Sequence, residues 1–382
     1  MASETTRVFC LGGNRIGMVP TMSEPTPRIR LRKVTIKDFR GIDHLEIELP
    51  PDDEERAGAL VIAGDNGVRK TSVLEAILIL FGRVDLLPAD TASPRELDRQ
   101  GATEFEITGT HTWSDQSLSW RVIRRQLEAL DQKLTERTGG SAFGVASVKA
   151  SLDDVHHQLF WRGPDPSQFA IEFFSARREP EDLGGATASA RSPHAPREER
   201  RLAELKRRLA NVFARSGAKN DTFGRIETFL RAFIGERWSL DVLFRSDELG
   251  SDPEVVVRDG PLPSASLTLD AIRDGAARGE KMPKVIPIDR LSAGQMALLA
   301  MTYPFVFADR VPDLVLIDEP EQHLHVSWQG ALLGALRALS PTTQFIVATH
   351  SPWVLDSVPS YERHELVSDD DPRATRVPDA AQ

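Results

Sequence analysis

Hydrophobic and polar positions begin to alternate regularly at about residue 30. Residues 31–38 and 44–49 repeat with a period of two, which is typical of half-buried strands, and Arg40–Gly41 lies between them as a turn. Ala59–Ala63 is fully apolar and precedes a glycine-containing loop. Residues 70–81 then carry apolar side chains at helical spacing. The first part of the chain therefore predicts a pair of strands followed by a strand–loop–helix unit.

The middle of the chain is patterned less evenly. Alternation predicts an antiparallel hairpin from residues 104–112 and 118–125, a further strand at 170–175, and a strand pair at 240–244 and 254–258. Residues 126–165 are weakly patterned, and residues 184–196 form a linker of small residues. Two amphipathic helices are expected at 197–215 and 222–234. The apolar face of the first consists of Leu202, Leu205, Leu209, Val212 and Phe213.

From Asp289 onward, helices and strands alternate compactly. The pattern predicts a helix at 292–308, a strand at Leu314–Asp318, a helix at Val326–Leu339 and a strand at 344–348. Such alternation implies right-handed crossovers and a largely parallel sheet. The expected fold class is therefore α/β, with a mixed or parallel sheet, an antiparallel β subdomain and an inserted helical subdomain.

These patterns suggest a division into domains. Residues 29–125 and 285–367 form the head, and residues 126–284 form an insertion that carries a helical hairpin at about 195–236. Residues 1–28 are expected to be a mobile leader, within which Met22 is an alternative start, and residues 368–382 a disordered tail.

Composition excludes several classes of protein. The single cysteine, Cys10, rules out a disulfide framework or a cysteine-based metal site. No apolar stretch approaches the roughly 18 residues needed to span a bilayer, so a cytoplasmic protein without membrane partners is expected. The formal net charge of −10 argues against indiscriminate nucleic-acid binding. Two basic runs leave a local DNA or RNA site open: Arg177–Arg178, and Arg197, Arg200, Arg201, Lys206, Arg207 and Arg208. For the second run, the pattern favours a solvated helix face.

The loop between the apolar strand and the helix predicts a phosphate-binding site. Residues 64–71 read Gly-Asp-Asn-Gly-Val-Arg-Lys-Thr, and glycines allow backbone N–H groups to turn toward phosphates at a helix N-terminus. Lys70 would reach the β- and γ-phosphates of a nucleotide, and the Thr71 hydroxyl would ligate Mg²⁺. The other nucleotide-binding candidates of this loop are Asn66, Gly67 and Ser72.

One position of this loop departs from the usual pattern. Arg69 stands where a glycine is expected immediately before the lysine. Its side chain could weaken nucleotide affinity, point away from the phosphates, or offer a further cation. Whether hydrolysis survives the change is left open by the sequence.

A pair of carboxylates follows the apolar strand Leu314–Asp318. Asp318, at the carboxyl end of the strand, is in a position suited to holding Mg²⁺. Glu319, which follows it, is suited to polarising an attacking water. The alternative is an ordinary helix start enriched in acidic residues.

Two further segments point to a nucleotide site only in combination with the phosphate-binding loop and the carboxylate pair. Residues 291–295, Leu-Ser-Ala-Gly-Gln, are by themselves a helix start capped by Ser292. His350, directly after an apolar strand, is by itself a structural histidine. The histidines His323 and His325 could bind a metal, but the sequence offers no third ligand nearby.

Along the chain, the phosphate-binding loop, residues 291–295, the carboxylate pair, residues 321–325 and His350 follow one another. Segments in this order resemble those of the SMC/RecF-like ABC ATPases. They are most similar to the compact AAA-type ATPases of bacterial defence and to the ATPase domain of OLD-type nucleases without the Toprim domain. The resemblance covers about residues 30–125 and 285–360. It implies that Ser292, Gly294 and Gln295 form a signature that binds the nucleotide of the opposite subunit. It also implies that residues 321–325 form the dimer-contacting D-loop, that His350 senses the γ-phosphate and that Arg40 packs beside the nucleotide. The Q-loop residue stays open among Gln100, Gln116 and Gln126.

The resemblance implies a homodimer that sandwiches ATP and Mg²⁺ and acts as a switch by hydrolysis. By analogy with the family, the expected function is gating of a partner effector, a nuclease, in a bacterial antiviral system. Two alternatives are open: a nucleotide-binding scaffold that turns over weakly because of Arg69, and a RecF-like DNA-repair ATPase.

Overall fold

The computed structural model describes residues 28–53, 56–83, 86–87, 105–113, 116–126, 146–148, 157–162, 169–176, 197–216, 219–246, 253–260 and 268–367. Residues 1–27 of the expected leader lie outside these residues, as do the expected tail, the 184–196 linker, Arg177, Arg178 and Gln100. The side chains of Gln116 and Gln126 are also outside the description, so none of the Q-loop candidates is tested.

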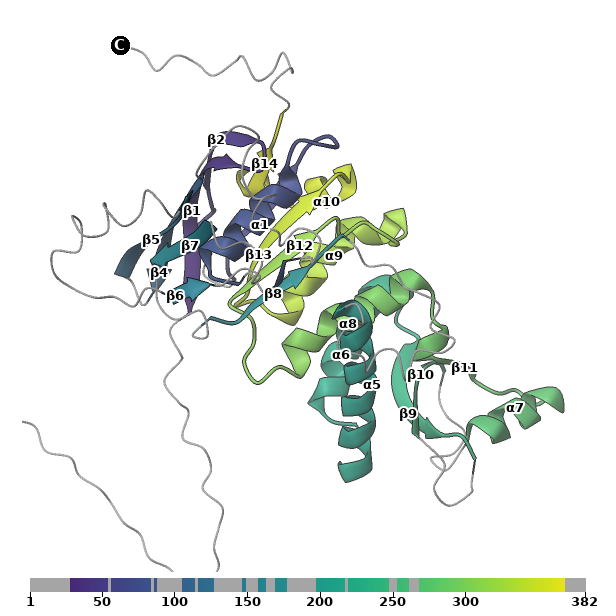
Figure 1. The fold of residues 1–382 in the computed structure, drawn as a ribbon. Helices are drawn as coiled ribbons and strands as arrows, with labels where there is room; N and C mark the ends of the chain where they lie inside the picture. Colours follow the sequence, from purple (N-terminus) through teal and green to yellow (C-terminus); the bar gives the residue numbers. More distant parts are fainter. Residues whose placement is uncertain are drawn as a thin grey trace, which may run out of the picture.

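A parallel sheet forms the centre of the molecule (Figure 1). Within the described residues its strand order is β14-β3-β13-β12-β8, and every neighbouring pair is parallel. The strands are β3 (Ala59–Ala63), β8 (Ile171–Phe174), β12 (Leu314–Asp318), β13 (Gln344–Thr349) and β14 (Arg363–Glu365). The apolar runs that predicted β3, β12 and β13 are buried along their whole length, as expected for strands covered on both faces.

The two faces of this sheet pack against different partners. Leu60 and Ile62 join a core with helix α1 (Lys70–Leu80), whereas Val61 joins a second core with the remaining large helices. Those helices are α5 (Arg197–Ser216), α6 (Asp221–Ile234), α8 (Ala293–Val306), α9 (Val326–Leu339) and α10 (Pro352–Asp356). Because successive side chains of a strand point to opposite faces of the sheet, each strand contributes side chains to two separate apolar cores.

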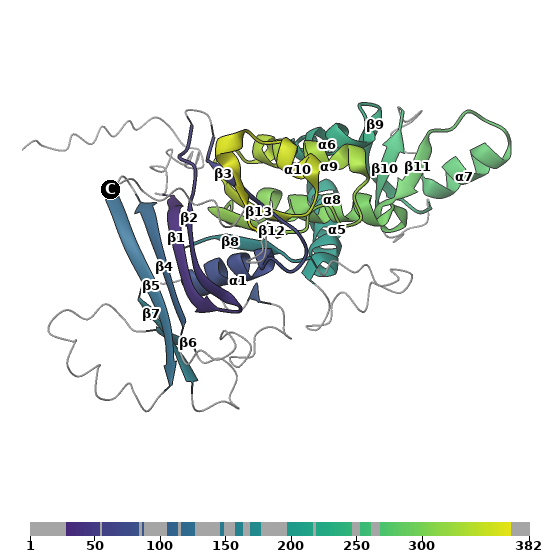
Figure 2. The ribbon, with the colours of Figure 1, turned by 90° about the horizontal axis from the view of Figure 1, so that it is seen from above.

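An antiparallel sheet covers the other side of α1, so this helix lies between two sheets (Figure 2). In the part of the chain that the structure describes, its strand order is β2-β1-β4-β5-β7-β6. The strands are β1 (Ile29–Phe39), β2 (Ile42–Glu48), β4 (Phe105–Trp113), β5 (Gln116–Gln126), β6 (Ala146–Val148) and β7 (His157–Arg162). The two hairpins expected from the alternation are confirmed, while β6 and β7 arise in the weakly patterned stretch.

Helices α5 and α6 pack against α8 and α9 rather than standing apart. Leu202, Leu205 and Leu209 are buried in this contact, which confirms the apolar face of α5. The neighbouring antiparallel sheet has the order β11-β10-β9, and a short helix lies against it. Its elements are β9 (Trp238–Phe244), β10 (Pro253–Asp259), β11 (Lys284–Pro287) and α7 (Leu269–Ala277). The β9–β10 pair was expected, and β11 and α7 were not.

Four basic residues of α5 are paired with carboxylates of the protein. Arg201 is ion-paired with Glu172, and Lys206 with Asp289. Arg207 and Arg208 both bind Glu204, whose pKa their hydrogen bonds lower to about 2. This pairing favours a neutralised helix face over a stripe for nucleic acid. Among the described residues, no helix combines the length and apolar character required to cross a bilayer.

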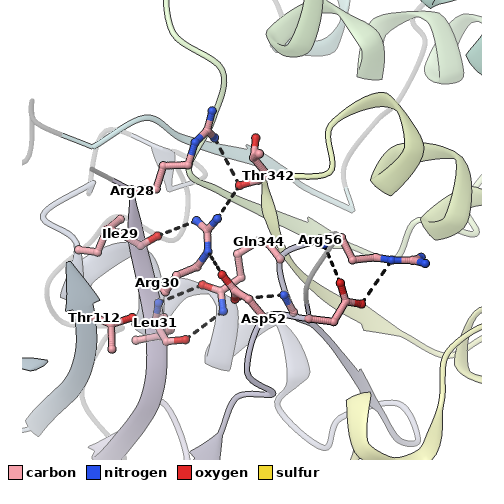
Figure 3. A network of polar contacts seen from close by, with 12 residues as sticks. Arg28, Ile29, Arg30, Leu31, Asp52, Arg56, Thr112, Thr342 and Gln344 are labelled. Carbon is pink, nitrogen blue, oxygen red and sulfur yellow. Dashed lines mark hydrogen bonds and ion pairs between the residues drawn. The ribbon is translucent and has the colours of Figure 1, made fainter. Parts of the chain in front are cut away.

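The two larger sheets are joined at the amino end of the parallel strands (Figure 3). The buried side chain of Gln344 accepts a hydrogen bond from the backbone N–H of Leu31 at 3.0 Å and donates to the Leu31 carbonyl at 2.9 Å. Arg30 donates to the carbonyl of Thr342 at 2.8 Å and to Asp52 at 2.8 Å. An amide side chain here takes the place of a neighbouring strand, because it supplies one donor and one acceptor.

Candidate functional site

The sequence-predicted site residues gather at the carboxyl end of the parallel sheet. The loops that follow β3, β12 and β13 carry, respectively, residues 64–69, 319–325 and 350–351. Neighbouring parallel strands end at the same edge, so these loops lie together. Ligands of open α/β sheets bind in this position.

The loop after β3 enters helix α1 through two glycines and a lysine. Gly64 has φ +154°, and a Cβ there would overlap the carbonyl oxygen of Leu366, which follows β14. Gly67 has φ +85°, is exposed, and has open space around it. Lys70 donates through Nζ to the carbonyl oxygens of Gly64 at 2.8 Å and Asp65 at 3.0 Å. The ammonium group therefore closes over the loop that would receive phosphates.

Arg69 occupies the expected glycine position in a left-handed conformation, with φ +68° and ψ +24°. Its side chain lies against the turn between β1 and β2: a Cβ at Gly41 would stand 2.9 Å from the Arg69 Nε. Gly41 itself has φ +86°. The two positions thus fit each other, and the side chain of Arg69 is directed toward the turn that carries Arg40. Which of the three alternatives for Arg69 holds stays a prediction.

Arg40, in the same turn, is held to helix α1. Its Nη1 lies 2.5 Å from Oε2 of Glu75, a residue only 1% exposed. A carboxylate buried in the apolar run of α1 requires such a charged partner. The sequence contains this signal, a lone Glu among Val, Leu, Ala and Ile, although Glu75 was not among the predicted residues.

The strand after the inserted region brings the acidic pair to the phosphate loop. The Thr71 hydroxyl donates to Oδ2 of Asp318 at 2.9 Å, and Asp318 is buried. Both groups are oxygen donors of the kind that Mg²⁺ prefers, and Mg²⁺ in nucleotide sites takes most of its other ligands from phosphates and water. The pair therefore fits that ion. Elsewhere in the described residues, no group of three metal-binding side chains forms, and this includes His323 and His325.

His350 connects the lysine to the second carboxylate. Its Nδ1 lies 3.1 Å from Lys70 Nζ, and its Nε2 lies 3.2 Å from Oε1 of Glu319. A protonated lysine has only donors, so Nδ1 must accept and the neutral ring must carry its proton on Nε2, where it faces the carboxylate. Burial lowers the pKa of Lys70, and Glu319 and Asp318 oppose that shift. Three predicted residues thus form one hydrogen-bonded chain.

The predicted signature lies apart from this chain. Ser292 is exposed and forms a capping box with Gln295 at the start of α8. Within the described residues, the hydrogen bonds of these two side chains run between Ser292 and Gln295 and not to Lys70. Gly294 packs so closely on the carbonyl of His323 that a Cβ would overlap it. The signature therefore touches the segment after Glu319, while Ser292 faces outward.

Backbone strain is concentrated in these loops. In the described part of the chain, the non-glycine residues with positive φ are Asp38, Arg40, Arg69, Glu319 and His323. Each such conformation costs about 1–3 kcal/mol and persists only where the surroundings impose it. Asp38 lies near the end of β1, and the others lie in the turn that follows it, in the phosphate loop or in the 319–325 segment. This clustering supports the edge as a candidate functional site on grounds independent of its side chains.

Comparison with known proteins identifies a family. Residues 59–356 match the family described as "AAA domain, putative AbiEii toxin, Type IV TA system". That range contains β3, the whole parallel sheet except β14, and the loops of the site other than the β1–β2 turn.

Individual relatives cover the chain to different extents. The "Retron Vc95 probable ATPase" of Vibrio cholerae serotype O1 biovar El Tor is 43% identical over 60 residues, which are 16% of this chain and 12% of that protein. The "DNA replication and repair protein RecF" of Anaeromyxobacter dehalogenans (strain 2CP-C) is 26% identical over 361 residues, 84% of this chain and 92% of that protein. The chain thus spans about an eighth of the retron relative and most of RecF.

Solved structures with a similar arrangement include the SMC head domain from Thermotoga maritima. It shares 16% identity with a TM-score of 0.44, over 88% of this chain and 94% of that one. The recombination mediator protein RecF-ATP of the RecFOR pathway shares 12% identity with a TM-score of 0.40, over 85% of this chain and 93% of that one.

Proposed function

The chain belongs to this family of AAA domains, and from that premise we propose that it is an ATP-binding and ATP-hydrolysing switch. The observation that carries the proposal is the chain Lys70–His350–Glu319 beside the Thr71–Asp318 pair. A cation, a neutral imidazole and carboxylates at one edge of a parallel sheet are the groups that phosphoryl transfer to water requires.

Each side chain has a role in this proposal. Lys70 exchanges its bonds to the loop carbonyls for bonds to the β- and γ-phosphates, with Asn66, Gly67 and Ser72 along the same loop. Glu319 orients the attacking water and accepts its proton, and the Nε2 proton of His350 lies beside that carboxylate. Thr71 and Asp318 would hold Mg²⁺, which neutralises charge on the phosphate oxygens when bound. Arg40 braces the loop through Glu75.

The exposed signature supports a dimer as the working form. Ser292, Gly294 and Gln295 stand at the N-terminus of α8, where backbone N–H groups favour anions. In the described part of the chain, Ser292 and Gln295 bond to each other and not to Lys70 of their own chain. A second copy in head-to-head arrangement would supply them to the opposite nucleotide in an isologous interface. ATP would then hold the dimer and hydrolysis would release it.

The switch would gate a separate effector, a nuclease of a bacterial antiviral system. Support for a defence role comes from the family description, which names a toxin of a type IV TA system, and from the 60-residue similarity to a retron ATPase. A second candidate, a RecF-like DNA-repair ATPase, is supported by the longer match to RecF. It requires ATP-dependent DNA binding by the isolated protein.

ATP turnover by the wild type, Glu319→Gln and Arg69→Gly tests the central proposal. Wild-type turnover is expected to fall by about 100-fold or more in Glu319→Gln, since general-base groups contribute 10²–10⁴ in rate. The glutamine variant should also accumulate ATP-bound dimers in sedimentation. Glu365→Gln, an exposed carboxylate at the end of β14, is the control and should behave as wild type.

Other outcomes favour the alternatives. Absence of wild-type turnover together with restored turnover in Arg69→Gly would establish the scaffold. Failure of Glu319→Gln to trap dimers would remove the sandwich mechanism. Tight ATP-dependent binding of a DNA duplex by the wild type would favour the repair ATPase.

A further inference from the structure

One carboxylate near the site takes no part in the chemistry proposed above. Glu321 accepts hydrogen bonds through Oε1 from the backbone N–H of His350 at 2.6 Å and of Ser351 at 3.1 Å. Its Oε2 accepts from the Thr349 hydroxyl at 2.8 Å. A side chain from the loop after β12 therefore holds the main chain of the loop after β13.

The next residue holds the other partner of His350. Gln322 donates through Nε2 to Oε2 of Glu319 at 2.5 Å. Glu321 fixes the backbone of His350, and Gln322 fixes the carboxylate that His350 faces. Two consecutive residues thus determine the distance between the imidazole and Glu319.

This arrangement leaves little freedom for the imidazole. The ring of His350 must meet Lys70 on one side at 3.1 Å and Glu319 on the other at 3.2 Å, both near the limit of a good hydrogen bond. Charge-assisted bonds from backbone N–H groups to a carboxylate are stronger than neutral ones. The negative charge of Glu321 is therefore the main restraint on where the ring stands.

The same segment touches the signature. Gly294 lies against the carbonyl of His323, two residues after Glu321. His323 has a strained φ of +64°, a conformation that persists only where the surrounding structure imposes it. A signature helix that moves when a second copy docks would carry Glu321 with it.

We propose that Glu321 is a positioning residue that sets His350 between Lys70 and Glu319, and thereby makes hydrolysis depend on the position of the 319–325 segment. The kinetic part rests on the proposed ATPase function. The structural part, control of the His350 ring by Glu321, stands independently of it.

The test compares Glu321→Ala and Glu321→Gln with the wild type in ATP turnover. Alanine removes all three acceptor contacts, and kcat is expected to fall by about 10- to 100-fold, the cost of a displacement of roughly 1 Å in a catalytic group. The KM for ATP should change by less than about threefold, because Lys70 and the phosphate loop are untouched. Glutamine keeps one oxygen for the two N–H donors, so it should recover part of the lost kcat.

A spectroscopic measurement follows the ring itself. Protein labelled with ¹⁵N-histidine reports the Nδ1 and Nε2 signals of each imidazole, and a His350→Gln variant assigns those of His350. The wild type should show the Nε2–H tautomer without nucleotide. In Glu321→Ala these signals should shift or broaden, with the glutamine variant between the two.

A matched control separates positioning from loss of stability. Glu362→Gln alters another buried carboxylate, which accepts from the backbone N–H of Ala59 at 3.2 Å and binds Arg337 at 2.8 Å at the opposite end of the sheet. It should lower the unfolding midpoint while leaving kcat and the His350 signals unchanged.

Both the turnover measurement and the ¹⁵N-histidine measurement can contradict the proposal. Unchanged His350 signals in Glu321→Ala would overturn the proposal, as would an equal loss of kcat in Glu362→Gln. A wild type without any turnover would defeat the proposed function, and the His350 signals would still decide the role of Glu321.

Discussion

The two ends of the parallel sheet use similar polar groups in opposite ways. At the amino end, Gln344 pairs with the backbone of Leu31, and Glu362 with that of Ala59. At the carboxyl end, Lys70, His350 and Glu319 bond to one another or to their own loop. In the described chain, the non-glycine residues with positive φ lie at the carboxyl end, in the turn that packs on it or, for Asp38, near the end of β1 that leads into this turn, and none lies at the amino end.

This difference suggests that stability and ligand binding depend on opposite ends of the sheet. At the amino end, the bonds of Gln344 and Arg30 join the antiparallel sheet to the parallel sheet (Figure 3). At the carboxyl end, the bonds join α1 and the loops at one edge of the parallel sheet, and they can be exchanged for bonds to a ligand. We expect substitutions at the two ends to affect different measurements.

The largest expected effect is on stability and comes from Gln344→Ala. It leaves the N–H and C=O of Leu31 buried without partners, at about 1–3 kcal/mol each. The free energy of unfolding should fall by about 3–5 kcal/mol in denaturant titration. ATP affinity of the folded fraction should stay within twofold. A loss under about 1 kcal/mol would show that this joint does not hold the sheets.

Lys70→Met tests the carboxyl end of the sheet, where we expect a loss of ATP affinity without a loss of stability. Without the ammonium group, affinity for a fluorescent ATP analogue should fall at least 100-fold, or about 2.7 kcal/mol. Stability should change by less than about 1 kcal/mol, because removing a charge whose burial lowers its pKa offsets the loss of its bonds. Lys281→Met, at an exposed lysine far along the chain, is the control and should leave both quantities unchanged.

Gly41→Ala tests the strained turn at intermediate magnitude. Alanine at φ +86° costs about 1–2 kcal/mol, and its Cβ would displace the Arg69 side chain. In an Arg69→Gly background the second penalty disappears, so the cost measured by thermal unfolding should be smaller there. Equal costs in both backgrounds would mean that the two residues are not coupled.

The smallest expected effect is that of Arg69→Gly alone on stability. Glycine relieves the left-handed conformation at φ +68° but adds freedom to the unfolded chain. The net change in unfolding free energy should be under about 1 kcal/mol. A larger loss would indicate that the contact of Arg69 with the β1–β2 turn stabilises the fold more than its backbone strain costs.

Much of the head could be predicted from the sequence because its elements carry strong patterns. The bounds of β3, β12 and α9 coincide with the expected segments, since strands buried on both faces form continuous apolar runs. Strand β14 could not be predicted: Arg-His-Glu has no apolar pattern, and its pairing with β3 depends on backbone groups alone. The β6 and β7 strands were missed in a stretch without clear alternation.

The site was predictable in membership but not in geometry. Motif order selected Lys70, Asp318, Glu319 and His350, and the structure brings their side chains together. The contacts of Glu321 could not be foreseen, because they link residues 28 or more positions apart through backbone donors. The direction of the Arg69 side chain also depends on a turn that is distant in sequence.

Strand β14 has a practical consequence for anyone shortening the protein. Leu366 donates its N–H to the carbonyl of Ala63 at 2.8 Å, and its own carbonyl lies against Gly64. A version that stopped before Arg363 would keep every recognised motif and still lose the wall on which the phosphate loop rests. The boundary of a working fragment is therefore set by a short polar strand that no motif search would retain.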